Sequence, residues 1–260
     1  MISFSSTDIN AWVVAFFFPL ARILALLVAA PPFSNAALPV RVRLMLGLAI
    51  AMAITPALPK ITPLDPASGI GLLILAQQLL IGFAMGFSLR LVFSAIDMSG
   101  NIIATQMGLG FATLYDPQNT AQTPVLSEFI GLLSLLIFMS INGHLMVIAT
   151  LTHSFTTIPI GTGALDSHTW LNLANAGVVV FSSGLLLALP IVAALLTTNV
   201  ALGVLSRAAP QLNPFAVGFP ITLTLGFGML MVSLSYMSAP LLQLFEHGLQ
   251  SMLGYFVAAR

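Results

Sequence analysis

Residues 70–96 read IGLLILAQQLLIGFAMGFSLRLVFSAI, an almost continuous apolar run whose one charged residue is Arg90. The run exceeds the roughly 20 residues that an α-helix needs to cross the hydrocarbon core of a bilayer. Its apolar residues are consecutive, whereas the strands of a membrane β-barrel alternate apolar and polar positions. Because backbone groups in lipid must be hydrogen-bonded within the segment, a helix is the structure that fits. The run therefore predicts a membrane helix.

Five further apolar stretches accompany this one, and the composition of the whole chain agrees with them. Of the 260 residues, 58% are hydrophobic and 5% are charged, against roughly 25% charged in soluble domains. We therefore expect an all-α, polytopic membrane protein of about six hydrophobic helical stretches, near residues 11–30, 44–58, 70–96, 125–151, 173–205 and 217–245.

Charge and cysteine content exclude several classes of function. Seven Lys and Arg balance seven Asp and Glu, so no basic field is available to attract nucleic acid. The absence of cysteine excludes thiolate zinc sites, iron–sulfur clusters and cysteine nucleophiles. His144 and His153 are nine residues apart, which places them on opposite faces of a helix. We expect no cofactor and no metal site.

Prolines and polar residues interrupt several of the stretches. Alone, each would mark an ordinary kinked helix with a local hydrogen bond, but together they favour helices that face protein more than lipid. These residues are Pro19, Arg22, Gln77, Gln78, Pro190, Asn199 and Pro220.

The second stretch is unusual because four prolines follow it within residues 55–66. We expect its helix to be confined to residues 44–54, about 11 residues and about 17 Å long at 1.5 Å per residue. A helix of that length is too short to cross a bilayer unaided. It could pair with the first stretch as a hairpin that only partly enters the membrane.

The loop between the third and fourth stretches, Gln106–Pro117, is apolar and uncharged until Asp116. Gly108 and Gly110 permit a positive φ, and large apolar side chains surround them on a segment that cannot be a regular helix. Such a segment could seal a pore. The alternative is a packing or re-entrant loop with no gating role.

Arg22, Arg90 and Glu128 lie within the stretches, and Asp97 directly follows one of them. One hypothesis is a proton or ion pathway through these groups. We favour structural ion pairing or snorkelling, because Asp97 and Glu128 lie at stretch ends that water or headgroups can reach. Separately, Gly82 and Gly86 form a GxxxG pair, which lets another helix approach closely.

Residues 205–220, LSRAAPQLNPFAVGFP, closely resemble a signature of the FliR family of flagellar export-gate proteins and of its relatives in virulence-associated type III secretion. Three further stretches agree in order: FPLAR at 18–22 with LPVRVR at 38–43, then residues 81–117, then Asn142-Gly143-His144 and the residues after it. The resemblance covers about residues 10–250. One departure is Gln77-Gln78, because many relatives carry a glutamate there.

The resemblance implies a single export-gate domain over residues 1–260, with about 1–170 similar to FliP and about 171–260 similar to FliQ. In the family, one FliR joins five FliP and four FliQ subunits in a spiral of kinked helices and bent hairpins, and FlhB docks against this gate. The implied location is the bacterial inner membrane at the flagellar basal body, with exported flagellar proteins as substrates and membrane lipid as a further contact. Such a chain would help to form and plug the export channel, act in flagellum assembly and catalyse nothing.

The resemblance also assigns candidate residues by position. The loop after the third stretch matches the family's channel plug, whose residues here would be Met107, Gly108, Leu109, Gly110, Phe111, Tyr115, Asp116 and Pro117. Candidates for subunit assembly are Arg22, Arg41, Arg43, Gly82, Gly86, Arg90, Asn142, His144, Arg207, Pro210, Gln211 and Pro220.

Two other classes of function stay open at this point. A secondary transporter with a midplane solute site would use Arg22, Arg90 and the broken helices, although the chain lacks two matching halves. An intramembrane enzyme would need a nucleophile beside a base, and His144 and Ser154 are the nearest pair.

Overall fold

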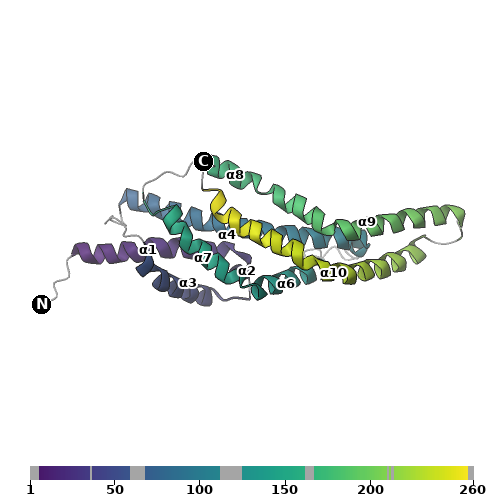
Figure 1. Ribbon diagram of the computed structural model, residues 1–260, viewed down its shortest axis with the longest axis horizontal. Coiled ribbons are helices and arrows are strands. Elements are labelled where there is room, and N and C mark those ends of the chain that lie inside the picture. The colour runs from purple at the N-terminus through teal and green to yellow at the C-terminus, as the bar shows by residue number, and fades with distance from the viewer. Residues whose placement is uncertain are drawn as a thin grey trace. The chain divides into compact units, whose positions relative to one another are not determined.

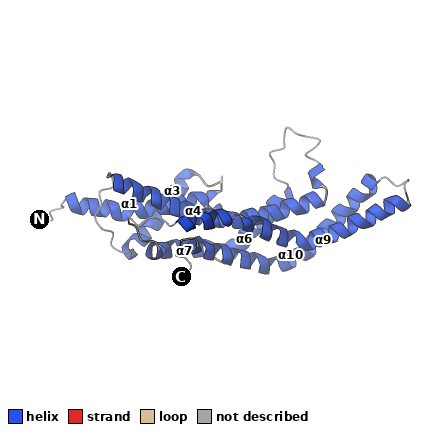
Figure 2. Ribbon diagram, turned by 90° about the horizontal axis from the view of Figure 1, so that it is seen from above, coloured by secondary structure: helices blue, strands red, loops and turns tan. Residues whose placement is uncertain are grey.

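The computed structural model describes residues 6–35, 37–58, 68–111, 125–161, 167–209, 211 and 214–256. Within these ranges every regular element is a helix, as Figure 2 shows in blue, so the all-α prediction is confirmed. The short 3₁₀ helices are η1 (Thr55–Ala57) and η2 (Leu109–Phe111). The α-helices, labelled in Figure 1, are α1 (Ser6–Ala29), α2 (Pro31–Ser34), α3 (Val40–Ile54), α4 (Gly69–Gln106), α6 (Val125–Ser140), α7 (Gly143–Thr157), α8 (Ser167–Asn175), α9 (Val178–Ala208) and α10 (Pro214–Gly254).

The helices group into two compact units. The first unit contains Met1–Leu91, Asn142–Ala176 and Glu246–Arg260, and the second contains Val92–Ile141 and Gly177–Phe245. Helices α4 and α10 therefore contribute one part to each unit. The division into a part at about 1–170 and a part at about 171–260 stays a prediction.

Several helices are long and apolar enough to cross a membrane. By length and composition, four candidate spans lie in the described part of the chain: Val40–Ala57, Gly69–Gln106, His168–Ala208 and Ala216–Gly254. A fifth exists if α6 and α7, a bent pair joined at a short break, count as one span. The polytopic character predicted from the apolar stretches is thereby confirmed.

Helix α3 differs from the expectation for the second stretch. It begins at Val40, four residues earlier than predicted, and η1 continues it to Ala57. Pro39 stands at the N-cap, where its missing N–H costs nothing, and its carbonyl accepts hydrogen bonds from the N–H groups of Val42 and Arg43. The prediction of a helix confined to residues 44–54 was wrong, and Val40–Ala57 is a candidate span by itself.

In the first unit, α4 packs closely against α1 because two glycines face that helix. A Cβ atom at Gly82 would overlap the carbonyl oxygen of Arg22, and one at Gly86 would lie 2.6 Å from the Cβ atom of Ala29. The two backbones can come this close only where a side chain is missing. The close approach expected from the GxxxG pair is confirmed, and the approaching helix is α1 of the same chain.

The second unit has an aromatic centre. Phe93 of α4, Phe138 of α6 and Phe245 of α10 contact one another, with ring centroids 5.7, 5.5 and 5.1 Å apart. These separations fall within the preferred range for aromatic pairs. Glycines again allow close packing, since a Cβ at Gly100 of α4 would lie 2.5 Å from Ser127 Cα of α6.

Helices α9 and α10 leave most of their apolar surface uncovered by the rest of the chain. Only 22% of the apolar window in residues 168–208 and 17% of that in residues 216–254 is buried. Val200, Val204, Met231 and Tyr236 are each more than 60% exposed. A continuous apolar surface of this size marks contact with lipid or with another protein.

Candidate functional site

The predicted plug segment begins where α4 ends. The N–H of Met107 still donates to the carbonyl of Ile103 at 2.9 Å, whereas the N–H of Gly108 donates to the nearer carbonyl of Thr105 at 3.0 Å. Gly108 adopts φ 83°, the left-handed conformation that commonly ends a helix and that glycine adopts without steric cost. The departure from regular helix expected after Gln106 is therefore found. Gly110, by contrast, does not use a positive φ.

Met107 anchors the start of this segment. Its side chain is fully buried, and it lies against Gly226 of α10 within the second unit. A Cβ atom at Gly226 would lie 2.6 Å from Met107 Cγ, 2.8 Å from Cε and 2.9 Å from Sδ. The space that holds the methionine therefore exists because residue 226 is glycine. We call this contact the Met107 seat.

The residues after Met107 are less enclosed. Gly108 and Leu109 are half-buried and Gly110 is exposed. Phe111 is the last residue of η2. Tyr115, Asp116 and Pro117 lie outside the described residues, so their predicted role stays a prediction.

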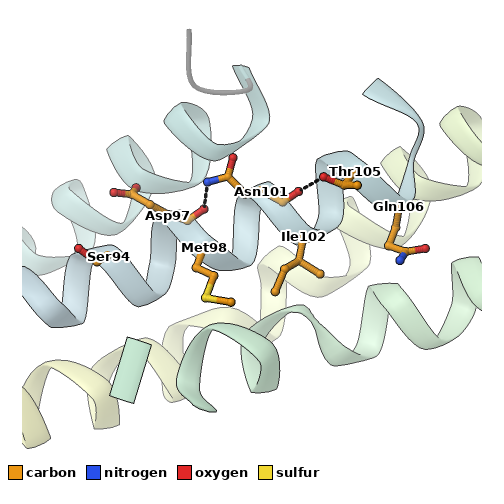
Figure 3. A pocket seen from close by; sticks show the side chains of 7 residues that line it. All are labelled: Ser94, Asp97, Met98, Asn101, Ile102, Thr105 and Gln106. Atoms are coloured by element: carbon orange, nitrogen blue, oxygen red, sulfur yellow. Dashed lines mark hydrogen bonds between the residues drawn. The ribbon is translucent and has the colours of Figure 1, made fainter. Parts of the chain in front are cut away.

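A hollow of about 510 Å³ lies beside α4 just before the segment. Figure 3 shows its seven lining side chains, all from the last turns of α4: Ser94, Asp97, Met98, Asn101, Ile102, Thr105 and Gln106. Within this set, Asn101 Nδ2 donates to the Asp97 carbonyl at 2.9 Å and Thr105 Oγ1 donates to the Asn101 carbonyl at 2.8 Å. Sequence reasoning noted Asp97 and Gln106 but missed the hollow, although polar residues at 94, 97, 101 and 105 repeat every three or four positions and could have indicated it.

Arg22 forms a separate polar cluster in the first unit. Its side chain is fully buried. Its Nε donates to Gln78 Oε1 at 2.8 Å, its Nη1 donates to the Ser154 carbonyl and hydroxyl oxygens, both at 3.0 Å, and its Nη2 donates to the Ile158 carbonyl at 2.9 Å. The guanidinium also lies 4.3 Å from the ring centroid of Phe155, within cation–π range.

This cluster corrects the expectation of ion pairing or snorkelling for Arg22. Every group that contacts the guanidinium is neutral, and four of its hydrogen bonds tie α1 to α4 and to the end of α7. The Nε2 of Gln78 is buried without a hydrogen-bond partner in the described part of the chain. Arg22 therefore cross-links three helices, and its donors are not available to a solute. Arg90, the second residue of the transporter hypothesis, is exposed.

The remaining candidates for subunit assembly are scattered over the chain. Arg43 donates to the Phe33 carbonyl at 3.0 Å, and Asn142 has φ 58° in the turn between α6 and α7. Half-buried His144 has a buried Nδ1 without a hydrogen-bond partner among the described residues. Pro210 lies outside the described residues. Arg41, Arg207, Gln211 and Pro220 are exposed. A role of any of these residues towards another subunit stays a prediction.

The structure keeps apart the two residues named as nucleophile and base for an intramembrane enzyme. His144 and Ser154 lie ten residues apart on α7, roughly 15 Å at 1.5 Å per residue. The Ser154 hydroxyl is fully buried, donates to the Leu151 carbonyl at 2.6 Å and accepts from Arg22. Among the described residues, no three His, Asp or Glu side chains gather as a metal site would require.

The long apolar helices and their uncovered surface define a polytopic membrane protein. Residues 13–248 match the family described as Bacterial export proteins, family 1, and the chain belongs to that family.

Several curated relatives carry one name. The chain is 47% identical over 227 residues to the Flagellar biosynthetic protein FliR of Pectobacterium carotovorum subsp. carotovorum, covering 87% of this chain and 86% of the relative. It is 44% identical over 240 residues to the protein of the same name from Escherichia coli (strain K12), covering 92% and 91%. The Bacillus subtilis (strain 168) protein of that name is 27% identical over 241 residues, covering 92% and 93%. The predicted resemblance to the FliR family is confirmed.

Proposed function

We propose that this chain is a non-enzymatic subunit of the flagellar type III protein export gate and acts in flagellum assembly. Family membership supports a role in export, and relatives at 44–47% identity are named for flagellar biosynthesis. The proposed location is the bacterial inner membrane at the flagellar basal body. The substrates would be exported flagellar proteins, which pass through the gate and are not chemically changed.

The observation that carries the proposal is the Met107 seat at the end of α4. It fixes the first residue of an apolar, glycine-bearing segment in one place, while Gly108 at φ 83° turns the chain out of the helix. An apolar segment held at one end can close a channel without binding an ion, and it can move aside without unfolding a helix. In the proposal, residues 107–117 are the plug of the export channel.

The uncovered apolar surface of α9 favours contacts with partner subunits. In α9, large exposed side chains run from Val178 to Leu205, roughly 40 Å at 1.5 Å per residue. The hydrocarbon core is about 30 Å thick, so lipid covers this surface fully only if the helix is strongly tilted. The proposed partners are FliP, FliQ and FlhB, with one copy of this chain beside five FliP and four FliQ.

The main test removes the segment from an assembled gate. Deletion of residues 108–114 should raise the flux of small ions across membranes that contain the complex, because the channel loses its closure. Co-purification with the partner subunits at wild-type amounts shows that the gate has assembled. Leakage at the wild-type level from such an assembled variant would contradict the proposal.

Two alanine variants in the same segment give a finer test. Gly108→Ala forces a non-glycine residue into the left-handed conformation, which costs roughly 1–2 kcal/mol. Gly110→Ala is its matched control, because a Cβ atom there meets nothing within 4 Å and φ is not positive. The proposal expects raised leakage for Gly108→Ala only. Equal leakage of the two variants would count against a closing role for this turn.

A further inference from the structure

We infer that the polar face of α4 formed by Ser94, Asp97, Asn101, Thr105 and Gln106 lines the water-filled part of the export path, up to the segment that closes it. The inference rests on the proposed gate function and adds the surface that faces the passage. The path would contain water and the hydrated polypeptide that is being exported.

The first argument is the chemistry of this face. Residues 94, 97, 101 and 105 are spaced by three or four positions and therefore lie on one side of the helix. All four are polar, although 58% of the residues in this chain are hydrophobic. Asp97 and Thr105 are exposed, and Ser94 and Asn101 are half-buried. An exposed polar stripe on a helix otherwise suited to lipid indicates that this side meets water.

The second argument is the carboxylate of Asp97. In the described part of the chain it has neither a hydrogen bond nor an ion pair, while the backbone carbonyl of the same residue accepts from Asn101 and Ser127. A carboxylate is strongly disfavoured against hydrocarbon. Asn101 and Thr105 also donate to carbonyls of their own helix, which leaves the Asp97 oxygens for solvent. Water is the neighbour that satisfies them.

The third argument is the shape around the face. Helix α6 flanks it where a Cβ atom at Gly131 would lie 2.9 Å from Asp97 Oδ1, and α9 flanks it where a Cβ atom at Gly184 would lie 3.2 Å from Met98 Cβ. Because residues 131 and 184 are glycine, no side chain projects from α6 or α9 towards Asp97 or Met98 at these points. Asp97 and Met98, which make these contacts, also line the hollow of about 510 Å³ (Figure 3).

The fourth argument is position. Gln106 is both the last residue of α4 and the last residue that lines the hollow. The next residue is Met107, whose side chain is fully buried in its seat. The polar face therefore ends where the proposed plug begins, which is the order expected for an aqueous passage and its closure.

The test uses thiol labelling, because the chain contains no cysteine and each introduced thiol is the only one in it. Ser94→Cys, Asn101→Cys and Thr105→Cys place thiols on the polar face, and Ser94→Cys is nearly isosteric, so it preserves the packing. Leu136→Cys and Val204→Cys are matched controls on exposed apolar positions of the same unit, at 66% and 65% exposure. Each variant is assembled into the gate, and membranes are treated with a charged, membrane-impermeant thiol reagent.

The polar-face thiols should react on the order of tenfold faster than the controls, because the thiolate is the reacting form and apolar surroundings suppress it. Their labelling should rise further in the variant that lacks residues 108–114. Labelling no faster than that of Leu136→Cys in both backgrounds overturns the inference, and so does labelling that begins only after the subunits are separated. If the deletion leaks ions while the face stays unlabelled, the inference fails and the proposed plug stands. If the face is labelled but the deletion does not leak, the face meets water and the plug fails.

Discussion

The Met107 seat yields a sharp prediction for Gly226→Ala. A Cβ atom at this position would come within 2.9 Å of three of the four side-chain heavy atoms of Met107. Because Met107 is fully buried, its side chain can make room only by shifting its packed neighbours or by leaving the core. The substitution should therefore dislodge Met107 or force it into a strained rotamer, and the segment after α4 should lose its anchor.

The free-energy cost of the substitution can be estimated for two structural outcomes. Overfilling a packed site costs roughly 1–3 kcal/mol, and expelling a buried methionine costs about 1.5–3 kcal/mol. A change of about 1–3 kcal/mol shifts the equilibrium between seated and unseated segments by about 5–150-fold. Alanine also gains roughly 0.5–1 kcal/mol over glycine inside a helix. That gain is shared by the control Gly228→Ala, where a Cβ atom meets nothing within 4 Å.

The assay compares ion leakage through gates that contain Gly226→Ala, Gly228→Ala or the unchanged chain. Leakage should rise for Gly226→Ala and stay at the unchanged level for Gly228→Ala, although the two glycines are two residues apart on α10. Co-purification of partner subunits and the thermal unfolding midpoint of each complex control for assembly. If assembled Gly226→Ala gates leak no more than Gly228→Ala gates, the Met107 seat does not hold the segment closed.

Three further substitutions test the packing of the first unit, and a fourth, Gly203→Ala in the second unit, serves as a control. Arg22→Met removes four hydrogen bonds and leaves acceptors without Arg22 on buried Gln78 and Ser154 and on half-buried Ile158, so the free energy of unfolding should fall by at least about 3 kcal/mol. A loss below about 1 kcal/mol would show that the cluster is not a cross-link. In Gly82→Ala the new Cβ atom overlaps the Arg22 carbonyl oxygen, so the free energy of unfolding should fall by about 1–3 kcal/mol. In the control Gly203→Ala the new Cβ atom meets nothing within 4 Å, so the free energy of unfolding should stay the same or rise in the same denaturation assay. Gln78→Glu places a carboxylate on Arg22 Nε and removes the unpartnered amide of residue 78, so unfolding should occur at an equal or higher denaturant concentration, and marked destabilisation would contradict the described geometry.

Features that depend on neighbouring residues could be predicted from the sequence. Continuous apolar runs with few charges indicated membrane helices, because lipid offers backbone groups no other partner. The spacing of Gly82 and Gly86 indicated a close helix approach, because residues four apart lie on one helix face. Gly108 indicated the end of regular helix after Gln106, and the structure uses its positive φ.

Features that depend on distant residues could not be predicted. The partners of Arg22 are 56, 132 and 136 residues away along the chain, so its fully buried, charge-free environment is set by tertiary packing. Met107 was assigned to the plug, but its anchoring by Gly226 joins residues on separate helices. The polar repeat from Ser94 to Thr105 is visible in the sequence, whereas the hollow that its side chains line is seen only in the folded structure.

The composition of the first unit bears on how the chain is made. That unit collects its segments from the beginning, the middle and the end of the sequence, and the last of them, Glu246–Arg260, contains the buried residues Leu249 and Met252. A chain emerging from the ribosome can form α1 and α4 early, but it cannot complete this unit until the final helix has been synthesised. Contacts between segments so far apart form slowly, and incomplete chains expose apolar surface meanwhile. Removing the last fifteen residues should therefore destabilise a unit whose largest segment, Met1–Leu91, is synthesised first.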